Sequence, residues 1–180
     1  MPDHIRLHDL DFVPFISAAE VQARVRALGA TLDAQYAGKN PLFIGILSGA
    51  FMFTADLVRC YGGPCEIAFV KLSSYAGVRS SGEVQSVIGL DKDLDGRHLI
   101  VVEDIVDTGR TLHFFLETLR DHEPASLAVV ALLRKPAAAE FTIPVDHVGF
   151  DIENRFVVGY GLDYEGLGRN LPGIHVLNEV

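Results

Sequence analysis

The fold is decided by one stretch of sequence, Leu99-Ile100-Val101-Val102-Glu103-Asp104-Ile105-Val106-Asp107-Thr108-Gly109-Arg110-Thr111-Leu112. It opens with an uninterrupted apolar run rich in β-branched residues, which is typical of a strand buried on both faces of a parallel sheet. The run stops at Glu103 and Asp104, a polar loop follows, and helical apolar spacing begins near Thr111. A strand, a loop and a helix in this order place the loop where open α/β sheets bind ligands.

The chemistry of this loop indicates a ligand with two different ends. Thr108, Gly109 and Thr111 offer hydroxyl and backbone N–H donors at a helix N-terminus, which suits a phosphate. The stretch also carries three acids within five residues, Glu103, Asp104 and Asp107. Such acids repel one another unless hydroxyls, cations or a metal lie between them. We therefore expect a ligand with a phosphate at one end and hydroxyls or a metal beside it.

Length and charge narrow the class of protein. A chain of 180 residues predicts a single domain, residues 1–180, that can bury a core without disulfides. Its hydrophobic fraction of 49% and charged fraction of 22% are ordinary for a folded globular protein. The formal net charge of -9 disfavours a nucleic-acid partner, which usually requires a basic surface. It leaves room for a phosphorylated small substrate held by a few cationic side chains and Mg²⁺.

Cysteine and histidine usage gives expectations about location and metals. Cys60 and Cys65 have no CxxC spacing and we expect no secretory signal, which favours a reducing, cytoplasmic location. No apolar stretch approaches the ~20 residues that a spanning helix needs, so no membrane partner is expected. The seven histidines show no ligand spacing and are interpreted as structural or solvated.

Strand and helix patterns alternate before the central stretch. Ser17-Ala18-Ala19-Glu20 has the spacing of a capping box and predicts a helix that ends before Gly38. The next expected elements are a strand at Leu42–Leu47, a helix at Ala50–Tyr61 and a strand at Cys65–Leu72. This βαβ order implies parallel pairing with a right-handed crossover.

The rest of the chain completes the expected α/β fold. Ser73–Glu83 is polar, punctuated by glycine and lacks an apolar period, as lid or binding loops do. The remaining expected elements are a helix at Thr111–His122 and strands at Val84–Leu90, Ser126–Leu133, His147–Phe150, Phe156–Tyr160 and Ile174–Leu177. We predict a doubly wound, mostly parallel twisted sheet flanked by helices. A small irregular cap, or hood, built by the last third of the chain would lie over its C-terminal edge.

The string V-V-E-D-I-V-D-T-G-R-T resembles the signature that type I phosphoribosyltransferases use to bind phosphoribosyl pyrophosphate (PRPP). It is most similar to the hypoxanthine-guanine branch, in which E-D-I-x-D-T-G-[K/R]-T recurs. It is neither a P-loop nor a Rossmann fingerprint. The resemblance implies the family's fold, transfer of a phosphoribosyl group to a base, and Mg²⁺ as cofactor.

The resemblance also implies a role for each part of the central stretch. Glu103 and Asp104 would hold the ribose hydroxyls and contribute to the Mg²⁺ site. The loop that would wrap the 5-phosphate consists of Asp107, Thr108, Gly109, Arg110 and Thr111. Asp107 would lie near the purine N7 and act as the general acid/base.

Three further segments resemble parts of the pyrophosphate side of the family's site. Leu47-Ser48-Gly49-Ala50-Phe51-Met52-Phe53 resembles the pyrophosphate loop, whose leading dipeptide has a non-proline cis bond in the family. Some relatives carry a lysine at the position of Ser48, so backbone donors would do more of the binding here. Ser74-Tyr75 matches the dipeptide of a mobile loop that folds over the reacting centre. Arg169 stands where relatives carry a pyrophosphate-binding arginine, although Glu165-Gly166-Leu167-Gly168 departs from their aromatic spacing.

The base side of the site is implied by two other segments. Lys135 resembles the lysine that donates to the exocyclic oxygen of the purine, and Arg134 lies beside it. The segment Asn154–Tyr164 resembles the family's base-binding segment. In it Phe156 would stack on the base, Val157 would offer backbone groups to the base edge, and Asp163 would reach Mg²⁺.

These resemblances imply purine salvage, in which hypoxanthine, and guanine as well, reacts with PRPP to give IMP or GMP and pyrophosphate. Another base, such as xanthine, adenine or a pyrimidine, is an open alternative, although the match around Phe156–Asp163 favours a 6-oxopurine. A PRPP-sensing RNA-binding regulator is disfavoured by the net charge of -9. A catalytically silent scaffold is disfavoured because every chemical position holds a suitable residue. Relatives assemble as dimers or tetramers, so a homo-oligomer is expected.

Overall fold

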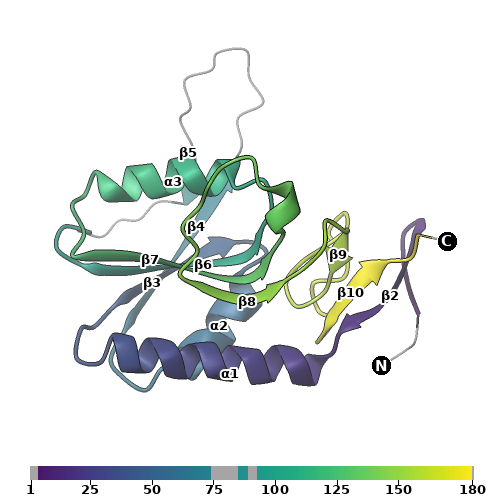
Figure 1. Ribbon diagram of the computed structural model, residues 1–180, viewed down its shortest axis with the longest axis horizontal. Coiled ribbons are helices and arrows are strands. Elements are labelled where there is room, and N and C mark those ends of the chain that lie inside the picture. The colour runs from purple at the N-terminus through teal and green to yellow at the C-terminus, as the bar shows by residue number, and fades with distance from the viewer. Residues whose placement is uncertain (1–3, 74–84, 89–92, 180) are drawn as a thin grey trace, which may run out of the picture.

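The computed structural model describes residues 4–73, 85–88 and 93–179, and its largest element is a six-stranded sheet in the order β5-β4-β3-β6-β7-β8 (Figure 1). Its strands are β3 (Leu42–Leu47), β4 (Glu66–Ser73), β5 (Gln85–Ile88), β6 (His98–Val106), β7 (Ser126–Arg134) and β8 (His147–Asp151). All neighbours pair in parallel except β5, which runs antiparallel to β4 at one edge. The carboxyl ends of the parallel strands therefore meet at one end of the sheet.

Helices cover both faces of this sheet. One face packs against α1 (Ala18–Gln35) and α2 (Phe51–Arg59), and the other against α3 (Arg110–Arg120). Alternate residues of β6 divide between the two cores: Ile100 and Val102 pack with α1 and α2, whereas Leu99 and Val101 pack with α3. All four side chains are fully buried. The doubly wound α/β prediction is confirmed, and so is the strand buried on both faces.

Local signals that mark element ends agree with the structure at α1. The Ser17 N–H donates to Glu20 Oε2 at 2.9 Å, and the Glu20 N–H donates to Ser17 Oγ at 3.3 Å. This is the predicted capping box. The strand predicted at Leu42–Leu47 has the observed bounds of β3.

The central strand is longer than predicted. The sequence places Glu103 and Asp104 at the end of the strand, whereas β6 continues past them to Val106. The backbone reason is that β7 extends equally far, and Glu103 pairs with Ala131 and Val106 with Arg134 in the same ladder. A change from apolar to acidic side chains ended the burial pattern without ending the backbone pairing.

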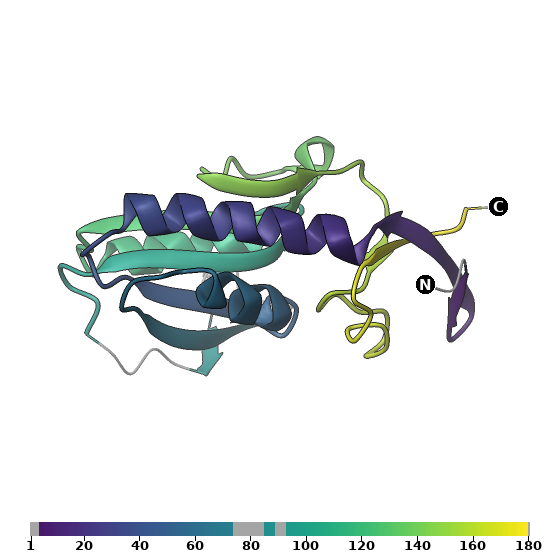
Figure 2. The same ribbon diagram turned by 90° about the horizontal axis from the view of Figure 1, so that it is seen from below.

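A second, smaller sheet forms the cap, in the order β1-β2-β10-β9. Its antiparallel strands are β1 (Ile5–Leu7), β2 (Leu10–Ile16), β9 (Val157–Val158) and β10 (Ile174–Leu177). Outside this sheet, a short 3-10 helix, η1 (Pro136–Ala138), follows β7. The expectation that the last third alone builds the cap is wrong, because the N-terminal strand β2 pairs along β10. Figure 2 shows this sheet beside one end of the long helix α1, with both chain termini near it.

In the part of the chain that the structure describes, no helix combines the length and apolarity needed to cross a membrane.

Candidate functional site

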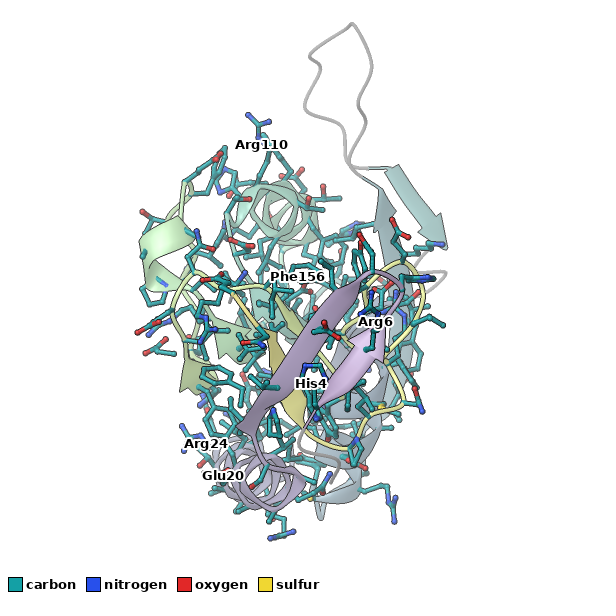
Figure 3. The ribbon with its side chains drawn as sticks, turned by 90° about the vertical axis from the view of Figure 1, so that its right-hand side faces the viewer. His4, Arg6, Glu20, Arg24, Arg110 and Phe156 are labelled. Atoms are coloured by element: carbon teal, nitrogen blue, oxygen red, sulfur yellow. The ribbon has the colours of Figure 1, made fainter. Side chains whose placement is uncertain are left out.

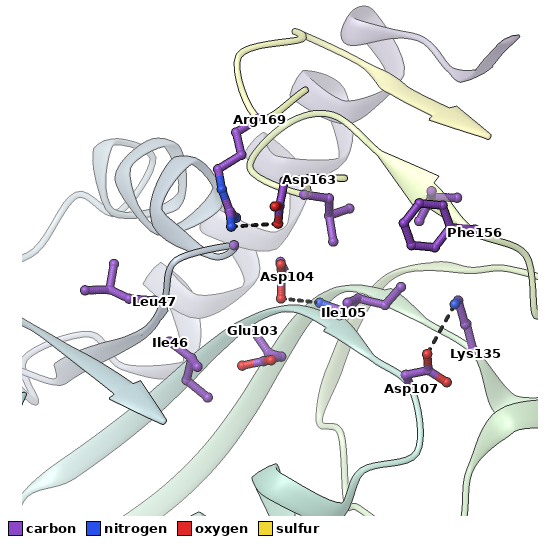
Figure 4. Close-up of a pocket in the computed structure, with 13 residues that line it drawn as sticks. Ile46, Leu47, Glu103, Asp104, Ile105, Asp107, Lys135, Phe156, Asp163 and Arg169 are labelled. Atoms are coloured by element: carbon purple, nitrogen blue, oxygen red, sulfur yellow. Dashed lines mark hydrogen bonds and ion pairs between the residues drawn. The ribbon is translucent and has the colours of Figure 1, made fainter. Parts of the chain in front are cut away.

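A cavity of about 330 Å³ lies between the carboxyl end of the large sheet and the cap (Figure 4). Its lining residues are Ile46, Leu47, Gly49, Glu103, Asp104, Ile105, Asp107, Lys135, Phe156, Val157, Leu162, Asp163 and Arg169. Strands β3 and β6 bring the first of these to the sheet edge, and the cap supplies the last five. This is the position at which open α/β sheets hold ligands.

Asp104 is packed directly against the backbone of Gly49. A Cβ atom added at Gly49 would lie 1.5 Å from Asp104 Oδ2, so residue 49 has no room for a side chain in this arrangement. The Ile105 N–H donates to Asp104 Oδ1 at 2.8 Å. Burial raises the pKa of Asp104 to about 6, while that hydrogen bond and the nearby Arg169 lower it. The Ile105 N–H therefore fixes the orientation of the carboxylate. Because burial disfavours its negative charge, a cation or a hydrogen-bond donor in the cavity would stabilise the ionised form.

Glu103 carries an unpaired polar atom inside the protein. Its Oε2 is buried and has no hydrogen-bond partner among the described residues. Burial, and next the charge of Asp104, raise the pKa of Glu103 well above its usual range. Buried polar atoms are nearly always paired, so an orphaned carboxylate oxygen at a cavity indicates that a ligand or a cation completes the site.

The donor set fits Mg²⁺. Within residues 4–73, 85–88 and 93–179, no three His, Cys, Asp or Glu side chains are grouped so as to hold a metal. Mg²⁺ is usually held by one or two carboxylates together with substrate phosphates and water, not by a complete protein cage. Glu103 and Asp104 provide that number of carboxylates, and they lie in the cavity where a phosphorylated substrate would complete the coordination.

Asp107 and Lys135 form an ion pair at the opposite side of the cavity. Lys135 Nζ lies 3.3 Å from Asp107 Oδ2, and the lysine side chain is only 7% exposed. The Lys135 N–H donates to Val106 O at 2.9 Å, which fixes the loop after β7 to the end of β6. Neighbouring Arg134 instead forms a two-point ion pair with Asp151, at 2.6 and 2.9 Å. Only the lysine of these two basic residues therefore faces the cavity.

A tight turn follows β3 at the cavity wall. The Leu47–Ser48 peptide bond is cis, as the family resemblance implied. Leu47 and Gly49 line the cavity, whereas Ser48 is exposed and does not. A Cβ added at Gly161 would lie 2.0 Å from Gly49 O, so the cap loop touches the turn through backbone atoms.

The cap contributes an ion pair and an aromatic ring to the cavity. Arg169 Nη2 lies 2.6 Å from Asp163 Oδ1, and Arg169 Nη1 donates to Gly161 O at 2.6 Å. Phe156 is 41% exposed although it is large and apolar, and it lines the cavity beside buried Val157. An exposed aromatic ring in a cavity that also holds the buried Lys135 ammonium suits a flat heterocyclic base.

The family model described as a phosphoribosyl transferase domain matches residues 17–165. The chain belongs to this phosphoribosyl transferase family. Its curated relatives include the hypoxanthine-guanine phosphoribosyltransferase of Bacillus subtilis, 43% identical over 94% of this chain and 94% of the relative. The hypoxanthine phosphoribosyltransferase of Haemophilus influenzae is also 43% identical, over 93% of this chain and 94% of that protein.

Solved phosphoribosyltransferase structures share the fold. That of the Staphylococcus aureus hypoxanthine phosphoribosyltransferase superposes with a TM-score of 0.87 at 38% identity, covering 92% of this chain and 90% of that one. The Trypanosoma cruzi hypoxanthine phosphoribosyl transferase gives 0.87 at 34% identity, covering 97% and 95%. A bifunctional protein TilS/HprT of Listeria innocua is 44% identical over 90% of this chain, and the chain spans 25% of its length.

The phosphoribosyl transferase cavity gathers most residues that the sequence singled out. Those that line it are Leu47, Gly49, Glu103, Asp104, Asp107, Lys135, Phe156, Val157, Asp163 and Arg169. Those that do not are Ser48, Thr108, Gly109, Arg110 and Thr111. Ser74 and Tyr75 lie outside the described residues. Arg169 reaches the cavity despite the unusual spacing before it.

The expected phosphate loop lies at the N-terminus of α3. Gly109 has a φ of 81° and occupies the N-cap position, where it has no side chain to cap the helix. The Arg110 N–H donates to Thr108 Oγ1 at 3.4 Å, so the following backbone N–H groups, of Thr111 and Leu112, are the ones available to an anion. The Arg110 guanidinium lies 5.9 Å from the Phe141 ring centre, and Figure 3 shows Arg110 at the periphery, away from Phe156.

Sequence reasoning missed two kinds of site residue. Ile46, Ile105 and Leu162 line the cavity, but isolated apolar residues carry no functional signal in a sequence. Tyr160 anchors the cap by donating its hydroxyl hydrogen to Asp56 Oδ2 at 2.7 Å. Flanking glycines hinted that the backbone near residue 160 is unusual, but nothing in the sequence indicated its partner on α2.

Proposed function

We propose that this chain is a hypoxanthine(-guanine) phosphoribosyltransferase of purine salvage. It transfers the 5-phosphoribosyl group from PRPP to hypoxanthine or guanine, giving IMP or GMP and pyrophosphate. The observation that carries the proposal is the convergence of the Glu103–Asp104 pair, Asp107 and the exposed ring of Phe156 on one cavity. The names of relatives at about 43% identity support the same activity.

The sugar and phosphate end of PRPP is assigned to the large sheet. Glu103 and Asp104 accept hydrogen bonds from the ribose 2- and 3-hydroxyls, which would satisfy the unpaired Glu103 oxygen. The loop from Asp107 to Thr111 wraps the 5-phosphate with backbone N–H groups of α3 and the threonine hydroxyls. The backbone after Leu47, Arg169 and the Ser74-Tyr75 dipeptide are assigned to the pyrophosphate.

The base end is assigned to the cap and to β7. Phe156 stacks on the purine, Val157 offers backbone groups to its edge, and Lys135 donates to the exocyclic oxygen. In the reaction the bond from the anomeric carbon to pyrophosphate oxygen breaks and a bond to the purine nitrogen forms. The base loses a proton as this bond forms, and Asp107 accepts that proton from N7 as the general base.

When bound, Mg²⁺ would supply positive charge that neutralises the pyrophosphate leaving group. Glu103, Asp104 and Asp163 are the residues that we assign to it. Asp163 would contribute through water, because its Oδ1 is paired with Arg169 and its Oδ2 accepts the Gly166 N–H at 2.7 Å.

The decisive experiment incubates the protein with PRPP, Mg²⁺ and each of hypoxanthine, guanine, xanthine and adenine, and separates nucleotides by chromatography. We expect IMP from hypoxanthine and GMP from guanine. Nucleotide from adenine or xanthine alone would move the activity to another base, and no nucleotide from any 6-oxopurine would contradict the proposal.

We also propose a cytoplasmic location and a homodimer or homotetramer. Cys60 and Cys65 are free thiols, which suits a reducing compartment. Light scattering coupled to size-exclusion chromatography tests the assembly, and a monomer at micromolar concentration would contradict it.

A further inference from the structure

The turn of the N-terminal hairpin contacts the cap loop that carries Tyr164, and His8 Nε2 of this turn also lies 3.4 Å from Glu165 O. Tyr164 donates its hydroxyl hydrogen to Asp9 Oδ1 at 2.8 Å, and Asp9 lies in the turn between β1 and β2. The His8 ring meets the Tyr164 ring edge-on, with centroids 5.7 Å apart. Asp9 and Tyr164 are 155 positions apart in sequence, so the tertiary fold brings the hairpin turn to the loop that carries Tyr164.

Tyr164 in turn supports the aromatic ring that faces the cavity. The rings of Phe156 and Tyr164 are 5.8 Å apart and nearly perpendicular, at 84°. Phe12 of β2 completes a three-ring cluster, 6.0 Å from Phe156 and 6.3 Å from Tyr164, and it is fully buried. Phe156 is therefore packed from behind by two rings while 41% of it stays exposed.

We propose that the β1–β2 hairpin contributes to the base site. Asp9 of the hairpin fixes the Tyr164 side chain by a hydrogen bond, and Tyr164 positions the Phe156 ring for the purine. This inference rests on the proposed function, because it assumes that Phe156 stacks on the base. An exposed ring without support samples several rotamers, and a base then binds only the fraction in the correct one. Edge-to-face packing and a tethered neighbour raise that fraction before the base arrives.

The effect is confined to the base because other bonds hold the PRPP side of the same loop. The backbones of Tyr164 and Leu167 pair with each other at 2.9 and 3.0 Å. Asp163 is fixed separately by the Gly166 N–H and by Arg169. Loss of the Tyr164 hydroxyl therefore leaves the Asp163–Arg169 pair intact and loosens only the aromatic support.

The test removes the Asp9–Tyr164 bond from either end, with Asp9→Ala and Tyr164→Phe. We expect each to raise the KM for hypoxanthine roughly three- to tenfold, the range for loss of one hydrogen bond, with the KM for PRPP unchanged. The double variant is expected to show no larger change than either single variant, because both remove one interaction. Asp9→Asn keeps an acceptor oxygen and should recover most of the affinity for hypoxanthine.

Asp11→Ala is the matched control in the same hairpin. The Asp11 side chain pairs only weakly with His4 and Arg6, at 3.8 and 3.7 Å, and the Tyr164 hydroxyl bonds to Asp9 instead. We expect its KM values to equal those of the unaltered protein. Thermal unfolding of every variant shows whether the hairpin remains folded, and Tyr164→Phe keeps the ring and is the variant least disturbed.

Phe156→Leu separates failure of this inference from failure of the proposed function. If it raises the KM for hypoxanthine while Asp9→Ala and Tyr164→Phe do not, the positioning role is overturned and the base site stands. If it changes nothing, Phe156 is not the base platform and the inference fails with that assignment. An equal rise of both KM values in the tether variants would reduce the hairpin to a structural element and would also overturn the proposal.

Discussion

At the scale of single residues, Gly49 and Asp104 lie so close together that position 49 has no room for a side chain. An alanine Cβ at position 49 would overlap Asp104 Oδ2, at 1.5 Å, and Asp104 is itself buried. The overlap can be relieved only by moving a carboxylate that we assign to the ribose, or the turn that we assign to pyrophosphate.

Gly49→Ala is therefore expected to raise the KM for PRPP at least tenfold and to cost about 1–3 kcal/mol of unfolding free energy, as overpacking does. Steady-state kinetics and urea unfolding measure the two effects. Gly62→Ala is the matched control, because an added Cβ there finds its nearest atom at 3.4 Å. A Gly49→Ala enzyme with the normal KM for PRPP would contradict the assigned role of the turn.

Asp107 is the residue to which we assign proton transfer. We expect Asp107→Ala and Asp107→Asn each to lower kcat about 10²–10⁴-fold, the usual contribution of a positioned acid/base, while PRPP still binds. Only the alanine variant leaves the buried Lys135 ammonium without its partner, so it should also be less stable. Rapid-quench kinetics and equilibrium dialysis with PRPP check this. Near-normal turnover in Asp107→Asn would remove the role from Asp107.

At the scale of elements, helix α1 allows a test of how much the Ser17–Glu20 capping box contributes to the free energy of unfolding. Ser17→Ala deletes the capping box and should cost about 1 kcal/mol of unfolding free energy. Thr31→Ala is the control on the same helix, because the Thr31 hydroxyl only donates to Ala27 O within the helix. Equal midpoints in urea for these two variants would show that the cap is unimportant.

The elements also show how much could be predicted from the sequence. Strands such as β3 and β6 are predictable because burial on both faces leaves a continuous apolar run. The end of β6 is not, because backbone pairing with β7 continues where the side chains become acidic. The site residues could be predicted only because the sequence motifs resemble those of a known family. The strand Leu10–Ile16 was missed because its partner β10 is distant in sequence.

At the scale of the whole molecule, cap and core share one cavity and one hydrophobic cluster, which contains Ile174 and Val176 of the cap as well as residues of α1 and β6. The chain is expected to unfold as one unit, residues 1–180, with the calorimetric enthalpy equal to the van't Hoff enthalpy. Hydrogen exchange followed by mass spectrometry should then give the cap strands β2 and β10 and the core strand β6 the same global opening limit. A separate early transition of the cap would contradict the single domain.

Acid should weaken the fold through His175. Its side chain is fully buried in the cap, and this burial lowers its pKa below the ordinary histidine value of 6.5. The unfolded chain therefore binds this proton more readily, so the contribution of His175 to the free energy of unfolding falls as pH drops below about 7.

His175→Leu is expected to remove this part of the pH dependence. The raised pKa values of Glu103 and Asp104 act in the opposite direction and are common to both proteins, so the difference between variant and parent isolates His175. Urea unfolding at several pH values from 7.5 to 5 measures that difference. A difference that stays constant over this range would show that His175 does not contribute.

The pairing of β2 with β10 determines when the cap can fold during synthesis of the chain. During synthesis β2 emerges from the ribosome before the large sheet, whereas the strand that pairs along it, Ile174–Leu177, emerges after that sheet. The large sheet can assemble from residues 42–151 while β2 still has an open edge. The half of the cavity that we assign to the purine is therefore completed after the large sheet, so the nascent chain has no complete base site until residues 174–177 have been synthesised.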